Sequence, residues 1–188
     1  MDENNTEFME FMKDRIPGMV DNIKIERFRE TDTLLVSELI RRNMGRFDQT
    51  EAVLVATFRR LSALTHSYLR EGCALFVAKM LDHSRGVDAL VACAGLGPLH
   101  GLPVSEGIGE IRDLVVNESL RGRGIGSRLL YRCIDEAKEL GYRRLYLETS
   151  QNMVKAKKLF VRSGFRPVAE VPGQDLPCYF LMENLQEH

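Results

Sequence analysis

The sequence predicts a mixed α/β fold, a twisted and mostly antiparallel sheet flanked by helices, with one parallel strand pair late in the chain. Two apolar, β-rich runs, CALFVAKML and DALVACAGL, are separated by the polar and glycine-containing DHSRG, which suits a hairpin connection. Further on, the apolar run EIRDLVV is followed by RGRGIG, an amphipathic stretch and the run RRLYLET. A strand-helix-strand order of this length favours parallel neighbours with a right-handed crossover.

Length and charge limit the classes of protein to consider. The chain has 188 residues, which fits one domain with a sizeable core. Its 26 basic and 27 acidic residues nearly cancel, and the sequence pI is about 6.4. This balance gives no overall attraction to nucleic acid or to an anionic membrane, so we expect neither as a partner.

The first segment reads as an extension in front of the domain. Phe8, Phe11, Met12 and Ile16 recur at helical spacing until Pro17 and Gly18 end the pattern. We therefore divide the chain into an amphipathic extension, residues 1–20, and a domain, residues 21–188. The extension has three open roles: it docks on the domain, it covers a partner subunit, or it frays in solution.

The cysteines and the first residues indicate a cytoplasmic protein. No C-x-x-C pair occurs, and no histidine lies at metal-ligand spacing from a cysteine, so we expect no metal. The four cysteines are read as reduced core thiols: Cys73, Cys93, Cys133 and Cys178. The acidic N-terminus lacks the pattern of a signal peptide, and no run of 18 apolar residues occurs.

The first half of the domain should begin with a strand and two helices. Residues 23–28 alternate as a strand, and Thr31 or Asp32 suits the N-cap of a helix. A second helix is predicted over residues 50–68, with Gly72 just past its end. The two hairpin strands follow, and a loop rich in glycine and proline leads to EIRDLVV.

The second half alternates helices and strands. A helix is predicted from Ile125 to its end at Gly141, and RRLYLET follows as a strand. A shorter helix is expected over residues 150–164, and FRPVAEV and CYFLMENL supply the closing strands. The sequence shows no internal repeat and no second-domain linker.

The glycine-rich turn RGRGIG is the strongest candidate for a binding site. It follows a strand and opens a helix, where unpaired N–H groups and the positive end of the helix dipole attract anions. Arg121, Arg123 and Arg128 lie around the same helix start, and their charges would repel one another unless an anion bound there. The spacing G-x-G-x-G excludes a Rossmann fingerprint, and the absence of G-K-[ST] excludes a P-loop. A plain turn with solvated arginines is the alternative.

In this context the segment RDLVVNESLRGRGIGSRLL resembles the acetyl-CoA signature, R/Q-x-x-G-x-G/A, of the GNAT superfamily of N-acetyltransferases. The order of strands and helices from about residue 23 to residue 185 is similar to that superfamily throughout. The resemblance implies acetyl-CoA as cosubstrate and a sheet whose parallel strands splay apart.

The resemblance also implies which residues bind coenzyme A. Backbone N–H groups of the turn would wrap the pyrophosphate, from Arg121, Gly122, Arg123, Gly124, Ile125, Gly126 and Ser127. The strand residues Leu114, Val115 and Val116 would run beside the pantetheine arm, which pairs with the open strand edge. Lys157, Lys158 or Arg162 would reach the outer phosphate, although each also reads as part of a solvated helix face.

Transfer to an amine needs a base, because an ammonium ion has no lone pair. Glu110 lies eleven residues before Arg121, where members that use a glutamate base often have it, and we take it as the catalytic candidate. A solvated or structural carboxylate is the alternative for Glu110. Strand alternation places Asp113 on the opposite face from Glu110, and His100 in the preceding loop is a weaker candidate.

The chain departs from the superfamily at the proton donor for the leaving thiolate. Many members have a tyrosine in A-x-x-L-Y-x-x-x-G-F, whereas this chain reads AKKLFVRSGF, with Phe160 at that position. Water, the acceptor's own proton, Tyr131, Tyr146 or Tyr179 would have to substitute, and the sequence does not choose among them.

The sequence hypothesis is therefore an acyltransferase that moves acetyl from acetyl-CoA to a primary amine by direct attack in a ternary complex. The acceptor, a small amine or a peptide amine, is not readable, and the segments 43–49, 97–108 and 171–177 are expected to shape its pocket. The alternatives are a non-catalytic module that binds or senses acyl-CoA and an interaction protein whose glycine turn is vestigial. A homodimer is a further expectation, because dimerisation is common in the superfamily.

Overall fold

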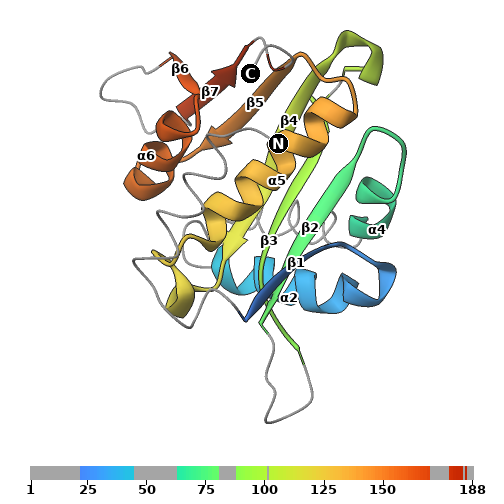
Figure 1. The fold of residues 1–188 in the computed structure, drawn as a ribbon, viewed down its shortest axis with the longest axis vertical. Coiled ribbons are helices and arrows are strands. Elements are labelled where there is room, and N and C mark those ends of the chain that lie inside the picture. The colour runs from blue at the N-terminus through green and yellow to red at the C-terminus, as the bar shows by residue number, and fades with distance from the viewer. Residues whose placement is uncertain are drawn as a thin grey trace, which may run out of the picture.

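One seven-stranded sheet organises the protein (Figure 1). The structure is a computed structural model that describes residues 22–44, 63–80, 88–100, 102–169, 178–183 and 185. The strand order across the sheet is β1-β2-β3-β4-β5-β7-β6. The strands are β1 (Ile23–Arg27), β2 (Ala74–Met80), β3 (Ala89–Pro98), β4 (Ile108–Val116), β5 (Arg144–Thr149), β6 (Arg166–Ala169) and β7 (Cys178–Met182). Only β4 and β5 pair in parallel among these strands, so the predicted mixed, mostly antiparallel sheet is confirmed.

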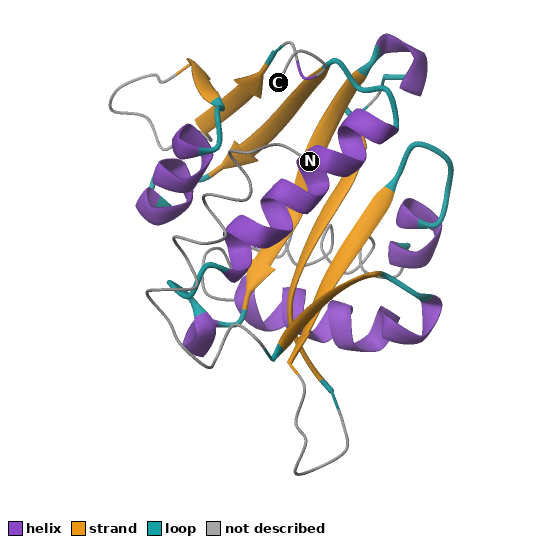
Figure 2. Cartoon of the chain, in the orientation of Figure 1, coloured by secondary structure: helices purple, strands orange, loops and turns teal. Residues whose placement is uncertain are grey.

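Helices cover both faces of the sheet (Figure 2). The described helices are α2 (Thr33–Met44), α4 (Leu64–Tyr68), α5 (Ile125–Glu139) and α6 (Val154–Arg162), with short 3-10 turns η1 (Glu30–Asp32), η2 (Val104–Glu106) and η3 (Glu118–Leu120). The predicted helix over residues 150–164 starts four residues late, because residues 150–153 form a turn. The predicted extension, residues 1–20, and most of the predicted helix over residues 50–68 lie outside the described residues.

Strand alternation divides the core into two clusters. On one face α5 packs its fully buried side chains, among them Leu129, Leu130 and Cys133, against Ala74 and Phe76 of β2. On the other face, side chains of α2 and α4 pack against the intervening β2 residues and β3, and the buried members include Val36, Ile40, Leu64, Tyr68, Leu75, Val77 and Cys93. Apolar residues that recur every 3.6 positions in the helices and every second position in the strands therefore produce a helix-sheet-helix arrangement.

The parallel ladder between β4 and β5 is short. It contains four registers, from Ile108↔Arg144 to Ile111↔Leu147. β4 then continues to Val116 with β3 as its partner, while β5 continues to Thr149 with β7 as its partner. The expected splayed pair is confirmed. Residues 112–116 of β4 have no pairing partner in β5, so this edge of β4 is open.

None of the helices that the structure describes is long and apolar enough to cross a membrane.

Tyr68 of α4 occupies the space beside Gly95 of β3. A Cβ added to Gly95 would lie 2.5 Å from Cε1 and Cζ of the Tyr68 ring, too close for a real contact. Gly95 therefore lets the ring of α4 lie directly on the strand.

We predict that Gly95→Ala lowers the free energy of unfolding by about 1–3 kcal/mol, because the added methyl group overpacks the contact with Tyr68. Urea denaturation checks this value. The cost should shrink in a Tyr68→Ala background, since the clashing ring is then absent. Gly126→Ala is the matched control, because its Cβ meets Val116 at an ordinary 3.5 Å. An equal cost of Gly95→Ala with and without Tyr68 would contradict the packing role.

Candidate functional site

The glycine turn lies between β4 and α5, as the sequence predicts. Gly122 and Gly124 both have φ of 79°, a left-handed conformation that favours glycine. Gly124 is the N-cap of α5 and provides no side-chain cap. The first N–H groups of α5 have no acceptor within the helix, so the turn presents donors and the positive dipole end in one place.

Gly126 lies where α5, α6 and the end of β4 meet. A Cβ added to it would lie 3.5 Å from Cγ2 of Val116 and 3.9 Å from Cδ2 of Leu159. A methyl group fits there at ordinary contact distances, whereas a large side chain would fill the space between β4 and α6.

Two of the three arginines around the turn bind neutral oxygen atoms of other elements. Arg121 donates from Nε to the carbonyl of Val116 (3.1 Å) and from Nη2 to Oδ1 of Asn43 (2.7 Å). Arg128 donates from Nη2 to the carbonyl of Ile23 in β1 (3.1 Å). Arg128, in the first turn of α5, thus has a partner in β1. Arg121 does tie the turn to the last residue of β4.

A polar network covers the middle of β4 on the face opposite α5. Nη1 of Arg112 lies 3.5 Å from Oε2 of Glu110, and Nε of Arg112 donates to the hydroxyl of Tyr68 at 3.2 Å. That hydroxyl donates to Oδ2 of Asp113 at 2.6 Å. Burial, followed by the charge of Asp113, raises the pKa of Tyr68 well above its usual value, so the hydroxyl stays protonated. Glu110, the predicted catalytic residue, thus belongs to a connected set of side chains.

A β-bulge explains why Asp113 joins this network. The register between β3 and β4 shifts between Cys93 and Gly95, and Asp113 has φ of 54°. The extra residue changes the alternation, so the prediction that Glu110 and Asp113 face opposite sides of the sheet is wrong. After the bulge Val115 packs in the α2 cluster, while Leu114 and Val116 pack in the α5 cluster.

Two stacked tyrosines lie on the two strands that follow Glu110 across the sheet, β5 and β7. Tyr146 of β5 is the register partner of Glu110, and its ring stacks on Tyr179 of β7 with centroids 5.7 Å apart. Burial, with smaller contributions from Tyr179 and Glu148, raises the pKa of Tyr146 to about 12. Its hydroxyl is therefore a proton donor rather than a base at neutral pH.

Phe160 of α6 is a core residue. It is 5% exposed and makes edge contacts with Phe165 and Phe180, at centroid separations of 6.3 and 5.6 Å. The ring at the position of the usual tyrosine therefore packs in an aromatic cluster.

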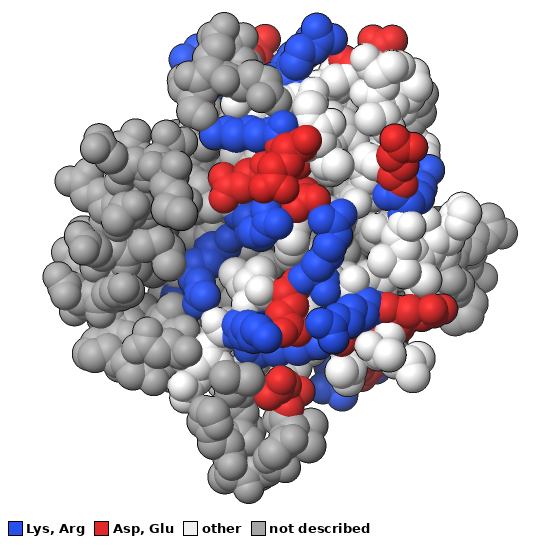
Figure 3. Space-filling model, turned by 45° about the vertical axis from the view of Figure 1, so that its right-hand side comes forward, with Lys and Arg blue, Asp and Glu red and all other residues white. Residues whose placement is uncertain are grey.

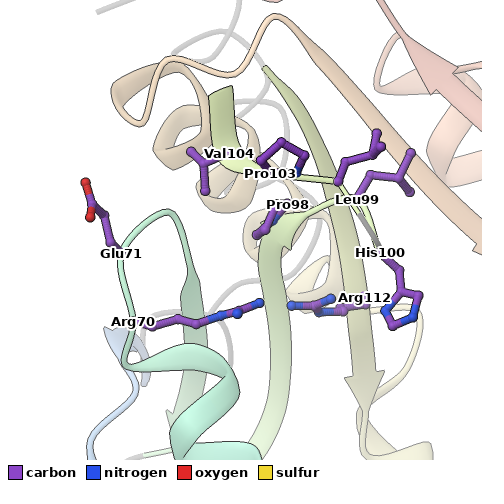
Figure 4. A pocket seen from close by; sticks show the side chains of 9 residues that line it. Arg70, Glu71, Pro98, Leu99, His100, Pro103, Val104 and Arg112 are labelled. Atoms are coloured by element: carbon purple, nitrogen blue, oxygen red, sulfur yellow. The ribbon is translucent and has the colours of Figure 1, made fainter. Parts of the chain in front are cut away.

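A pocket of about 370 Å³ lies at the end of the β3–β4 hairpin (Figure 4). Its lining residues are Arg70, Glu71, Pro98, Leu99, His100, Leu102, Pro103, Val104 and Arg112. The sequence predicted the hairpin loop as part of an acceptor pocket, but it gave no signal for Arg70 and Arg112. These two arginines come from the turn after α4 and from β4, 42 positions apart, and only the fold brings them together.

The described cysteines offer no nucleophile in this region. All four are buried free thiols, and burial raises the pKa of Cys133 well above its usual value. Within the described residues, no cluster of three or more His, Cys, Asp or Glu side chains has the arrangement of a metal site.

The charges elsewhere are mixed. Figure 3 shows acidic and basic side chains interleaved on the face that it displays. Ion pairs between described residues, such as Arg132–Glu136 and Lys79–Asp32, join the two signs.

Comparison with known families gives the assignment. The acetyltransferase (GNAT) family matches residues 37–165, more than half of the chain. The chain belongs to this family. The expected acyltransferase superfamily is thereby confirmed at the level of the family, and the matched range contains the glycine turn, Glu110 and the parting of β4 and β5.

Relatives of this GNAT protein carry related names. The chain is 29% identical over 144 residues to the aminoalkylphosphonate N-acetyltransferase of Salmonella typhimurium, a match covering 73% of this chain and 90% of that protein. It is also 29% identical over 79 residues to the uncharacterized N-acetyltransferase YjgM of Escherichia coli. That second match spans 42% of this chain and less than half, 46%, of YjgM.

The GNAT fold is also shared with solved structures. The structure of yncA from Salmonella typhimurium, which contains its cofactor acetyl-CoA, superimposes with a TM-score of 0.67 at 19% identity. The match covers 89% of this chain and 96% of yncA. At this identity the likeness shows a common fold.

The raised pKa of Tyr146 leads to a prediction about stability at high pH. Below pH 10, the ordinary value, the residue is protonated in both the folded and the unfolded protein. Between pH 10 and about 12 the unfolded chain loses the proton first, so folding stability should fall across this window. Tyr146→Phe should show a shallower fall in chemical denaturation measured from pH 9 to 12. Identical slopes for the two proteins would contradict the shift.

Proposed function

We propose that this GNAT protein transfers an acetyl group from acetyl-CoA to a primary amine by direct attack within a ternary complex. The observation that carries the proposal is the parting of β4 from β5 after Ile111 and Leu147. This opening lies between Glu110, at the last registers of the ladder, and the glycine turn, which follows the same strand. The candidate base and the residues proposed to bind coenzyme A thus lie along one strand. This arrangement suits a mechanism in which the enzyme holds the thioester and the amine next to each other.

Coenzyme A would bind along β4 and the turn. Backbone N–H groups of the turn from Arg121 to Ser127 suit the pyrophosphate, because a helix N-terminus with glycines admits an anion close to the backbone. The strand residues 114–116 suit the pantetheine arm, since an open strand edge binds extended amides as an added strand would. The acetyl-CoA bound in yncA supports the same cosubstrate here.

Glu110 would act as the general base, directly or through a water molecule. Its carboxylate is partly exposed, with 18% of the side chain accessible, and it lies at the start of the opening. Arg112 holds one of its oxygen atoms at 3.5 Å, which orients the carboxylate. A positioned base typically contributes about 10²- to 10⁴-fold to the rate.

The bulge of β4 supports polarisation of the thioester carbonyl. Asp113 and Leu114 have no register partner in β3, so the backbone here departs from the regular ladder. Backbone N–H groups at such a site are suited to stabilise the developing oxyanion. The departing thiolate is a tolerable leaving group, because a thiol has a pKa near 8.5. Tyr131, Tyr146, Tyr179, water and the acceptor's proton remain the candidate donors.

The second candidate function is a module that binds or senses acyl-CoA without turnover. The observation that favours it is Phe160, a buried phenyl ring where many members have a hydroxyl. Amine-dependent release of coenzyme A distinguishes the two functions.

The acceptor is proposed to be a small amine rather than a protein terminus. The support is the relative that acts on aminoalkylphosphonates, whose match covers most of both chains. We also propose a cytoplasmic enzyme, supported by four buried free thiols, and a homodimer as its assembly, which sedimentation would test.

The proposed transfer is tested by calorimetric titration with acetyl-CoA and coenzyme A, followed by thiol release over a panel of amines. Binding with amine-dependent release supports the transferase. Binding with no release for any amine favours the sensing module, and absence of binding contradicts both.

We predict that Gly126→Trp abolishes binding of coenzyme A, because the indole would fill the space between Val116 and Leu159. Calorimetry measures the affinity, and circular dichroism checks that the fold persists. Gly126→Ala is the matched control and should retain binding, since its methyl group makes only ordinary contacts. Unchanged affinity in a folded Gly126→Trp variant would remove the turn from the site.

We predict that Glu110→Gln lowers kcat by about 10²- to 10⁴-fold, with the largest loss at low pH, where less of the acceptor amine is free. Initial rates from pH 6 to 10 measure this profile. Glu139→Gln, which changes an exposed carboxylate at the end of α5, should keep the wild-type profile. A wild-type profile in Glu110→Gln would exclude Glu110 as the base.

A further inference from the structure

The pocket at the end of the β3–β4 hairpin carries two converging arginines. Figure 4 shows the side chains of Arg70 and Arg112 pointing toward one another, with His100 beside Arg112. Glu71 is the carboxylate among the described lining residues, and its side chain points away from both guanidinium groups. Two like charges that face each other repel, so this arrangement suits an anion between them.

Arg112 is held in place by its surroundings. Its guanidinium lies 5.3 Å from the centroid of the Tyr68 ring, and its Nε donates to the Tyr68 hydroxyl. A Cβ on Gly97 would lie 2.5 Å from Nη2, so this glycine makes room for the guanidinium above β3. The side chain is 22% exposed. A fixed arginine binds an oxyanion well, because little further ordering is needed.

Arg112 also has further N–H donors for a ligand. A guanidinium has five N–H donors, and the bonds to Tyr68 and Glu110 use two of them. Arg70 is exposed in the turn after α4, and within the described part of the chain its guanidinium donates no hydrogen bond to another residue. The pair can therefore offer several N–H groups to one ligand.

The pocket is separate from the proposed coenzyme site. Arg112 lies four residues before Val116 on β4, about 13 Å along a strand from the start of the glycine turn. Its side chain also lies on the face of Tyr68 and α4, opposite α5. A phosphate of coenzyme A bound at the turn would not occupy this pocket.

The pocket is next to the candidate base. Arg112 contacts both the pocket and Glu110, whose carboxylate is 3.5 Å from Nη1. We infer that this pocket binds the acidic group of the acceptor, so that the substrate is a small amine that also carries a carboxylate or phosphonate. This inference rests on the proposed transfer. When the acidic group of the substrate lies between Arg70 and Arg112, its amine reaches Glu110 only if a short chain joins the amine to the acidic group.

The test compares matched acids and neutral analogues as acceptors. One pool contains amino acids, β-alanine and 2-aminoethylphosphonate, and the other contains the corresponding amides and propylamine. Thiol release with acetyl-CoA gives kcat/KM for each member, and ligand-detected NMR with the coenzyme A complex gives binding without transfer. The best acidic amine should exceed its neutral partner by about 10-fold or more. The carboxylates and the phosphonate show separately which oxyanion fits.

Variants of Arg70 test the residue that the inference names. Arg70→Gln should raise KM for the acidic acceptor by about 10- to 100-fold. It should cause little change in kcat, in KM for acetyl-CoA and in kcat/KM for the neutral analogue. Arg70→Lys should restore part of the affinity, and Arg70→Glu should lower it further. Arg41→Gln, which removes an exposed arginine of α2, is the matched control and should match wild type.

Each outcome decides a different point. Equal or better use of the neutral amines, or an unchanged preference in Arg70→Gln, overturns the anion pocket while the transferase stands. Binding of the acidic pool that Arg70→Glu abolishes, without thiol release, supports the pocket and contradicts the transfer. NMR that detects no acidic ligand on the wild-type complex overturns the inference whatever the transfer assay gives.

Discussion

The separation of β4 from β5 is the constraint on which the site depends. The two strands share four registers and then follow different partners, β3 and β7. A strand that loses a neighbour exposes N–H and C=O groups, which need another partner. A ligand with its own amides can supply that partner at low cost to the fold. The sheet keeps its continuity at Glu110 and opens directly beyond it.

The packing of α5 places the glycine turn at this opening. Its buried face anchors the helix on β2, β3 and β4, so the position of its first residues is set by the core. Arg121 then ties the turn to Val116 and to Asn43 of α2. These two bonds hold the turn where a pyrophosphate would need preorganised donors, although its glycines by themselves favour no single conformation.

The bulge in β4 gives the opposite face its chemistry. By adding one residue, it directs Asp113 to the side of Glu110 and Arg112, where Tyr68 bonds to Asp113 and Arg112, and Arg112 bonds to Glu110. Gly95 and Gly97 of β3 leave room for the Tyr68 ring and the Arg112 guanidinium. The α5 side of the strand is therefore apolar, whereas Glu110, Arg112 and Asp113 lie on the other side, where the acceptor is proposed to bind.

The order of the described elements, the glycine turn at a helix start and the family could be predicted from the residues, because periodicity and turn residues are local signals. The sequence also placed Glu110 in a strand before the turn. Only the folded chain shows the partners of Arg121 and Arg128, the face of Asp113 and the convergence of Arg70 with Arg112. A β-bulge changes which face of the sheet the following side chains occupy, and the residues of β4 carry no pattern that predicts it. The contact of a turn with a distant strand depends on how the helices pack, which residue spacing does not encode.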